Sequence, residues 1–264
     1  SRAAIHGRGA VMTGRVTLTI EDGIGRILLD RADKMNAITP EMTLELQQVC
    51  RAVDANRDVR VVTIAGAGER AFSAGSDLNT LVDLSDVMAF RDRIEYAALV
   101  REIRKPVIAA LKGWVLGGGM EIAIAADIRI CGRGARIGGP EVTRGWLGGG
   151  GASQMLPRLV GVGQTMRLLL TGDPVDAETA LRLGLVEEVV DDAEVAARVI
   201  EVARKIASFS PTATQAIKAA VRAAMSMPLG AGLRYENELH VICMSDEGRL
   251  EGIRAFQEKR DAKF

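Results

Sequence analysis

The amino-acid sequence predicts an α/β fold that ends in a helical region. Short β-branched apolar runs alternate with helical spacing over the first part of the chain, and after residue 161 almost every segment has helical spacing. No Pro/Ser-rich linker and no internal repeat divides the 264 residues, 48% of which are hydrophobic, enough for a sizeable core. We therefore expect one functional unit, with an α/β core at 14–200 and a helical region at 201–264.

The first elements are a hairpin and a buried strand. Strands are expected at 16–20 and 25–29, on either side of the turn signal Glu-Asp-Gly at 21–23. The run VRVVTIA (59–65) is apolar without alternation, which is typical of a parallel strand covered on both faces.

Apolar spacing indicates the helices. The first is expected from Pro40 to about Asn56, because Thr39 before the proline is a good helix start. Further helices are expected at 84–103, 120–126, 152–159, 161–170, 175–183, 193–208, 211–225, 229–244 and 246–256. Short strands are expected at 107–111, 128–131 and 136–137. The segment 71–78 is too short and too broken by glycine for a regular element.

Charge and composition exclude several partners. Lys+Arg and Asp+Glu number 34 each and aromatic residues are only 3%, so the chain has no footprint for nucleic acid or an anionic membrane. Three distant cysteines, Cys50, Cys131 and Cys243, form neither a metal pattern nor a disulfide framework, which favours a reducing compartment. No apolar run reaches the ~18 residues of a membrane span. Residues 1–13 lack a signal-peptide core, with Met12 a candidate initiator, and are left out of the fold prediction. We expect a cytoplasmic protein.

The histidines and the motifs exclude several chemistries. Only His6 and His240 are present, and no GxSxG motif exists to form a Ser-His-Asp triad with them. HExxH is absent, as are GxxxxGK[ST] and GxGxxG, so neither a metal nor a nucleotide phosphate site is indicated.

Three segments remain that combine glycine-rich backbone with polar side chains: AFSAGSDL (71–78), GWVLGGGMEIAIAAD (113–127) and GGPEVTRGWLGGGG (138–151). The second and third also carry one glutamate each, Glu121 and Glu141. Glycine at the start of a helix leaves a backbone N–H uncovered, and two such groups from separate loops form an oxyanion hole.

Glu121 and Glu141 are candidate acid–base catalysts. Glu121 stands in the first turn of the apolar helix MEIAIAA, where loss of hydration should raise its pKa toward neutrality. Considered alone, Glu121 could be a helix-dipole partner and Glu141 a solvated loop acid. Their shared glycine context favours catalysis.

At these residues the sequence closely resembles the crotonase superfamily, the enoyl-CoA hydratase/isomerase family. The resemblance covers about residue 16 to 264. Its marks are LDRADKMNAIT (29–39), AGAGERAFSAGSDL (65–78), KPVIAALKGWVLGGGMEIAIAADIRI (105–130), the stretch 138–151, TGDPVDAETALRLGLVEEVV (171–190) and EGIRAFQEKR (251–260). It implies a crotonase-like spiral of ββα turns, with C-terminal helices that take part in trimerisation and in the CoA site, and assembly as trimers or hexamers.

The resemblance also implies residue roles. Ser76 and Gly118 would supply the oxyanion N–H groups, Glu121 and Glu141 would be the catalytic glutamates, and Gly149 would help to hold the attacking water. The residues implied at the CoA site are Lys34, Ala74, Asp77, Leu78, Phe256 and Lys259. For Phe256 and Lys259 an amphipathic last helix is the plain alternative.

The implied reaction is addition of water across the 2,3 double bond of a 2-enoyl-CoA, as in fatty acid metabolism. The thioester is the substrate and no separate cofactor is expected. The two glutamates would divide the roles of acid and base, because close carboxyls split their pKa values. A dehydratase of the carnitinyl-CoA type and a double-bond isomerase are alternatives on the same scaffold. A non-catalytic CoA- or RNA-binding member is a third.

The chain departs from the family pattern at several positions. Ser76 stands where alanine is usual, and Leu147-Gly-Gly-Gly-Gly151 replaces Pro-Gly-x-Gly-Gly. Arg144 and Trp146 stand where smaller residues are common. We expect them near the acyl group, with packing as the alternative for Trp146, so they bear on acyl specificity more than on reaction class.

Overall fold

The computed structural model describes residues 15–81 and 86–264. Within them the chain forms two sheets, one with strand order β1-β2-β3-β5-β7-β10 and one with order β4-β6-β8-β9. Residues 84 and 85 of the helix expected at 84–103, residue 14 of the expected core, Met12 and His6 lie outside the described residues. No helix in the described part combines the length and the apolar character that a membrane span requires.

The large sheet begins with the expected hairpin. β1 (Val16–Glu21) pairs antiparallel with β2 (Ile24–Leu29), and positive φ angles at Asp22 and Gly23 close the tight turn. The strands that follow run parallel in the order β3 (Val61–Gly66), β5 (Val107–Leu111), β7 (Ile128–Gly132) and β10 (Glu188–Val190).

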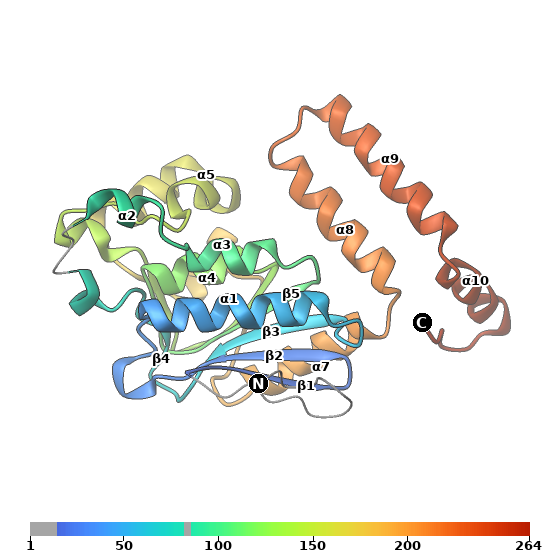
Figure 1. Ribbon diagram of the computed structural model, residues 1–264, viewed down its shortest axis with the longest axis horizontal. Helices are drawn as coiled ribbons and strands as arrows, with labels where there is room; N and C mark the ends of the chain where they lie inside the picture. Colours follow the sequence, from blue (N-terminus) through green and yellow to red (C-terminus); the bar gives the residue numbers. More distant parts are fainter. Residues whose placement is uncertain (1–14, 82–85) are drawn as a thin grey trace.

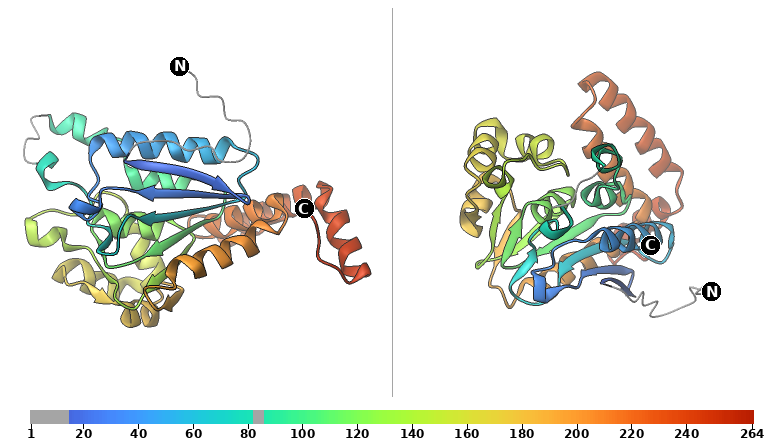
Figure 2. Two further views of the ribbon diagram at one scale, coloured as in Figure 1. Left: turned by 90° about the horizontal axis from the view of Figure 1, so that it is seen from below. Right: turned by 60° about the vertical axis from the view of Figure 1, so that its left-hand side comes forward.

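Helices cover both faces of this sheet, which is why its central strands β3 and β5 are almost entirely apolar (Figures 1 and 2). One face carries α1 (Pro40–Ala55), whose N-cap Thr39 accepts a hydrogen bond from the Met42 N–H. The other face carries α7 (Val195–Ala207), which packs against alternate strand residues such as Val61 and Ile108.

The second sheet gives the fold its spiral. β3, β5 and β7 each lead into a strand of the small sheet, namely β4 (Ala71–Ser73), β6 (Trp114–Leu116) and β8 (Arg136–Gly138), before the chain turns into helical structure. β9 (Val175–Asp176) closes the sheet antiparallel to β8. This repetition confirms the expected α/β class with ββα turns.

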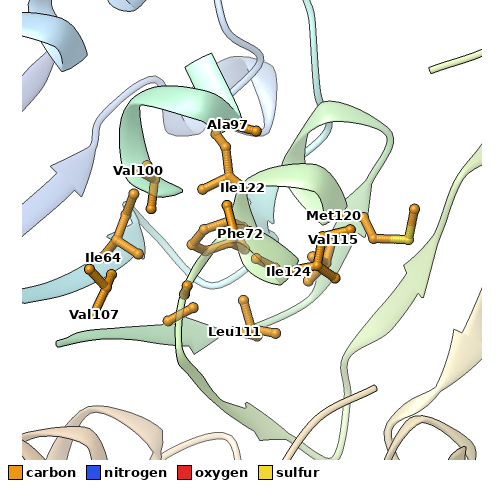
Figure 3. Close-up of a cluster of buried hydrophobic side chains, with 14 of the residues drawn as sticks. Ile64, Phe72, Ala97, Val100, Val107, Leu111, Val115, Met120, Ile122 and Ile124 are labelled. Atoms are coloured by element: carbon orange, nitrogen blue, oxygen red, sulfur yellow. The ribbon is translucent and has the colours of Figure 1, made fainter. Parts of the chain in front are cut away.

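The core centres on α4 (Gly118–Ala125), which is buried along its whole length. Figure 3 shows Phe72 of β4 among side chains of α4, β5 and α3 (Tyr96–Glu102). The tight packing explains the glycine before Met120, because a Cβ built on Gly119 would lie 2.2 Å from the Ser73 carbonyl oxygen. The helix that carries Glu121 is therefore held rigidly.

The C-terminal helices leave the core as a separate arm (Figure 1). After α5 (Ala152–Thr171), α6 (Ala177–Leu183) and α7, the arm consists of α8 (Pro211–Ala224), α9 (Leu229–Ser245) and α10 (Gly248–Glu258). Asp127 ties the second half of α8 to the core by ion pairs with Lys218 at 2.7 Å and Arg222 at 2.8 Å. Residue 200, where we placed the end of the core, lies inside α7, so the projecting arm begins only with α8.

The structure corrects several sequence-based elements. The helix expected at 84–103 is two helices, α2 (Val87–Arg91) and α3, because Glu95 caps a new helix by accepting from the Ala97 and Ala98 N–H groups. The helices expected at 152–159 and 161–170 form one element with a kink at Gly161. β4 lies in the segment 71–78 that we left irregular, and β6, β9 and β10 were missed because strands of two or three residues leave no period. Three short 3-10 helices complete the described elements: η1 (Ala32–Lys34), η2 (Leu78–Leu81) and η3 (Pro140–Arg144).

Candidate active site

A cavity of about 700 Å³ opens between the start of α1, the α2–α3 region and the loop after η3. Both predicted glutamates and Ser76 line it. Most of the remaining lining is apolar. Besides Gly148 and Gly149, its apolar and aromatic residues are Ile38, Pro40, Leu44, Leu81, Phe90, Ile94, Tyr96, Trp146 and Leu147. A large apolar cavity with a few convergent polar groups is typical of a small-molecule site.

Glu121 is the buried carboxyl of the site, with a side chain on the first turn of α4 and an exposed fraction of 2%. Its Oε1 atom accepts hydrogen bonds from the Gly150 N–H at 2.8 Å and the Ala152 N–H at 3.2 Å. Burial raises the pKa of Glu121 to about 7, against the effect of these two donors, and the charge of Glu141 adds to the rise. With Oε1 occupied, Oε2 is the oxygen left for proton exchange.

Glu141 lines the same cavity. A Cβ built on Gly148 would lie 2.9 Å from Glu121 Oε1 and 3.2 Å from Glu141 Oε1, so the two carboxyls approach each other beside this glycine. Burial raises the pKa of Glu141 also, and the charge of Arg144 opposes the rise. Two carboxyls that each favour the neutral form can supply one acid and one base near neutral pH.

The two backbone donors expected from the glycine motifs lie beside each other. Gly75 and Gly117 have φ angles of 88° and 54°, which favour glycine, and they precede Ser76 and Gly118. A Cβ built on Gly75 would lie 2.8 Å from the Gly118 nitrogen, so the two loops touch. Neither the Ser76 N–H nor the Gly118 N–H donates to an acceptor within residues 15–81 and 86–264. The pair has the arrangement of an oxyanion hole.

Tyr96 is a site residue that the sequence analysis missed. It begins α3, lines the cavity, and its hydroxyl shares a 2.9 Å hydrogen bond with the Ser76 hydroxyl. No local motif marks it, because the contact joins residues 20 apart in the sequence. The only signal was that Ser76 itself departs from the family pattern.

The residues expected around the adenine lie in two segments that the structure joins. Ala74 N–H donates to the Met35 carbonyl, and the Asp77 carboxylate forms a 2.6 Å ion pair with Arg31. Lys34 is exposed on η1, next to Met35, and Leu78 is exposed at the start of η2. Arg31 holds the pKa of Asp77 below its usual value, so the carboxylate is engaged in structure. The Asp77 backbone is engaged too, because its N–H donates to the Ile38 carbonyl and its carbonyl accepts from Thr80.

The remaining predicted residues differ in position. Gly149 and Trp146 line the cavity, whereas Arg144 does not and instead donates to the Pro140 carbonyl. Phe256 and Lys259 lie at the end of α10 on the projecting arm, away from the cavity of the same chain, and Phe256 has an exposed fraction of 86%.

Comparison with known proteins gives the family. The sequence profile described as enoyl-CoA hydratase/isomerase matches residues 19–264. The chain belongs to the enoyl-CoA hydratase/isomerase family. It is 36% identical to the (E)-benzylidenesuccinyl-CoA hydratase of Thauera aromatica, over 94% of this chain and 98% of that protein. It is 35% identical to the short-chain-enoyl-CoA hydratase of Clostridium acetobutylicum, over 93% and 95%.

Solved structures of the family have the same fold. The enoyl-CoA hydratase of Bacillus anthracis superimposes with a TM-score of 0.91 at 34% identity, covering 95% of this chain and 99% of that one. The coverage includes the arm as well as the core, so the helical C-terminal region is part of the family fold.

Proposed function

We propose that the protein is a hydro-lyase that adds water across the 2,3 double bond of a 2-enoyl-CoA thioester. The observation that carries the proposal is the placement of Glu121 and Glu141 next to Gly148 in a cavity that Ser76 also lines, with the Gly118 N–H beside the Ser76 loop. The (E)-benzylidenesuccinyl-CoA, short-chain-enoyl-CoA and crotonyl-CoA hydratases among its relatives support the same reaction.

The two N–H groups would bind the thioester oxygen. Conjugation carries electron density from the double bond to this oxygen as water attacks Cβ, so a partial negative charge develops there. Preorganised donors stabilise that charge more than they stabilise the neutral carbonyl. Gly118 adds the positive end of α4, because it is the first residue of that helix.

The two glutamates would manage the protons. One, ionised, takes a proton from the attacking water, whose oxygen bonds to Cβ. The other, protonated, gives its proton to Cα, and the double bond becomes single. The product gains one oxygen and two hydrogens, which balances the added water. An isomerase needs only one acid–base group, so two facing carboxyls favour hydration.

Residues around the pair support further roles. Gly149, beside Gly148 in the lining, is suited to hold the water, and Trp146 and Leu147 would contact the acyl group. The segments of Lys34, Ala74, Asp77 and Leu78 would receive the CoA portion. No cofactor beyond the CoA of the substrate enters this mechanism.

We also propose that the chain works as a trimer or hexamer. Exposed apolar side chains on the arm support assembly, and so does the distance of Phe256 and Lys259 from the cavity of their own chain. In an assembly these two residues would reach the CoA site of a neighbouring copy.

The experiment is hydration of crotonyl-CoA, followed as loss of the conjugated thioester absorbance. Glu121→Gln and Glu141→Gln should each lower kcat by at least about 10²-fold, the contribution of a positioned acid or base. Circular dichroism checks that both variants fold. Wild-type protein that leaves a series of short, long and aryl enoyl-CoA esters unchanged would contradict the proposal. Conversion of 3-enoyl-CoA alone would support the isomerase instead.

A further inference from the structure

The Tyr96 hydroxyl lies at the meeting point of the two oxyanion loops. It is 2.9 Å from the Ser76 hydroxyl. It also touches the other loop, because a Cβ built on Gly118 would lie 1.8 Å from the Tyr96 oxygen. The phenol oxygen is therefore next to both residues whose N–H groups form the hole, and Tyr96 itself lines the cavity.

Packing alone does not account for this hydroxyl. The aromatic ring begins α3, and a phenylalanine ring would fill the same volume. The hydroxyl is oriented by the Ser76 side chain, at the position where the family usually has alanine. A tyrosine and a serine that are paired beside an oxyanion hole form a side-chain hydrogen-bonding unit, in addition to the two backbone donors.

We propose that Tyr96 is a third donor of the oxyanion hole, with its O–H directed to the thioester oxygen of the bound substrate while the Ser76 hydroxyl donates to the Tyr96 oxygen. The inference rests on the proposed function, because it concerns the same carbonyl. It makes Tyr96 a catalytic residue that contacts the reacting group and Ser76 a residue that positions it.

The chemistry requires a phenol that stays protonated. Tyr96 transfers no proton in this scheme; it donates one hydrogen bond, which strengthens as charge develops on the carbonyl oxygen. Burial raises the pKa of Tyr96 above its usual value, the hydrogen bond with Ser76 opposes this, and the nearby Glu121, Glu95 and Glu141 reinforce it. The phenol is therefore the neutral donor near neutral pH.

The first test is Tyr96→Phe assayed for hydration of crotonyl-CoA. Removal of one hydrogen bond to a charged oxygen should lower kcat about 10- to 100-fold with KM changed far less. The matched control is Tyr235→Phe, which alters the only other tyrosine of the chain, on α9, and should keep wild-type kinetics. Wild-type kcat in Tyr96→Phe would overturn the proposal.

Ser76→Ala separates the two side chains while keeping the backbone N–H. It should cost less than Tyr96→Phe, because the phenol can still donate, and the double variant should be no slower than Tyr96→Phe alone. Losses that multiply in the double variant would show that the two hydroxyls act independently, which contradicts the proposed positioning by Ser76.

A second measurement does not depend on turnover. Butyryl-CoA has no double bond to hydrate, and the infrared stretch of its isotope-labelled thioester carbonyl reports hydrogen bonds to the oxygen. Bound to the wild type, this band should lie at lower frequency than when bound to Tyr96→Phe. Tyr235→Phe, the matched control, should keep the wild-type frequency. Equal frequencies in wild type and Tyr96→Phe would overturn the inference.

The two measurements distinguish the possible failures. If wild-type protein hydrates no enoyl-CoA, the proposed function fails, yet the carbonyl band still tests Tyr96. If hydration proceeds and Tyr96→Phe changes neither kcat nor the band, the proposed function stands and the role of Tyr96 is wrong.

Discussion

Glu121 shows at the scale of one residue how function opposes stability. Its carboxyl is nearly inaccessible, and both backbone donors that reach it bind the same oxygen, Oε1. The other oxygen therefore lacks a backbone donor, which leaves the ionised form incompletely compensated. An uncharged side chain that keeps one accepting oxygen, such as glutamine, would give a more stable folded state.

Glu121→Gln should therefore stabilise the protein above neutral pH. The pKa rises from 4.5 in the unfolded chain to about 7 in the fold, so the folded state binds the proton more tightly. The stabilising effect of the neutral carboxyl is complete below pH 4.5 and is lost as the pH rises through about 7. Above that pH the ionised carboxylate costs on the order of 3 kcal/mol, which glutamine avoids. The free energy of unfolding, measured in urea from about pH 5 to about pH 8, should favour the variant increasingly as the pH rises.

The control for this effect is Glu69→Gln, which removes an exposed carboxylate that pairs with Lys112 at 2.9 Å. An exposed ion pair contributes about 0–1 kcal/mol, so this variant should not gain stability at high pH. A wild type as stable as Glu121→Gln at about pH 8 would show that Glu121 is not held in an environment that opposes its charge.

The sequence could single out residues whose local neighbourhood is unusual. Glu121, which lines the cavity, stood out because a carboxylate within an apolar helix is costly, and the segments of Ser76 and Gly118 stood out because glycine clusters mark uncovered backbone. Tyr96 could not be singled out, since only the folding of α3 against the oxyanion loops brings it there. The Gly150 donor to Glu121 has the same origin, a tertiary contact across 29 residues.

At the scale of elements, glycines with positive φ angles, Gly75 and Gly117, form the two turns that precede Ser76 and Gly118. Gly75→Ala would place a methyl group 2.8 Å from the Gly118 nitrogen, in the proposed oxyanion hole. Gly161, at the kink of α5, also has a positive φ angle, 78°, but nothing lies within 4 Å of its Cβ position. Alanine variants at Gly75 and Gly161 therefore separate the effect of backbone strain from that of steric blockage.

Both alanine variants should lose on the order of 1–3 kcal/mol of stability through backbone strain. Only Gly75→Ala should also lose about 10²-fold or more in kcat, because a donor to the oxyanion is obstructed. Unfolding in denaturant and crotonyl-CoA hydration measure the two effects. Equal kcat values for the two variants would show that the Gly75 loop does not border the reacting carbonyl.

The loop after η3 is the element that should set acyl specificity. Trp146, with an exposed fraction of 43%, lines the main cavity and also a second cavity of about 440 Å³ that Leu169 and Leu170 of α5 border. Glu141, Leu147 and Gly148 border both spaces as well, so the two cavities adjoin at this loop. Truncating the indole should enlarge the space open to the acyl chain.

Trp146→Ala should shift the ratio of kcat/KM for long-chain over short-chain enoyl-CoA upward by about tenfold or more, since apolar contacts discriminate on that scale. Trp114→Ala is the matched control, because Trp114 has a similar exposed fraction, 41%, but lies on β6 and lines neither cavity. An unchanged ratio in Trp146→Ala would assign the tryptophan to loop packing alone.

At the scale of the whole molecule, the arm is too apolar for an isolated chain. Ile217 and Val221 on α8 and Leu229 and Leu233 on α9 have exposed fractions of 64%, 62%, 77% and 57%. Ion pairs from Asp127 to Lys218 and Arg222 hold α8 against the core, and α9 packs against α8. Apolar surface of this kind on neighbouring elements marks an interface.

Light scattering after gel filtration should therefore find a trimer, about three times the mass of the 28.2 kDa chain, or a hexamer made of two such trimers. Ile217→Glu combined with Val221→Glu should dissociate it, because charges buried in an apolar interface lose their hydration. Dissociation should also raise KM for the CoA ester if Phe256 and Lys259 complete a neighbour's site. Leu181→Glu on α6 of the core should leave the mass unchanged. A monomeric wild type would refute assembly. A dissociated variant with the KM of the wild type would show that each CoA site is formed by a single chain.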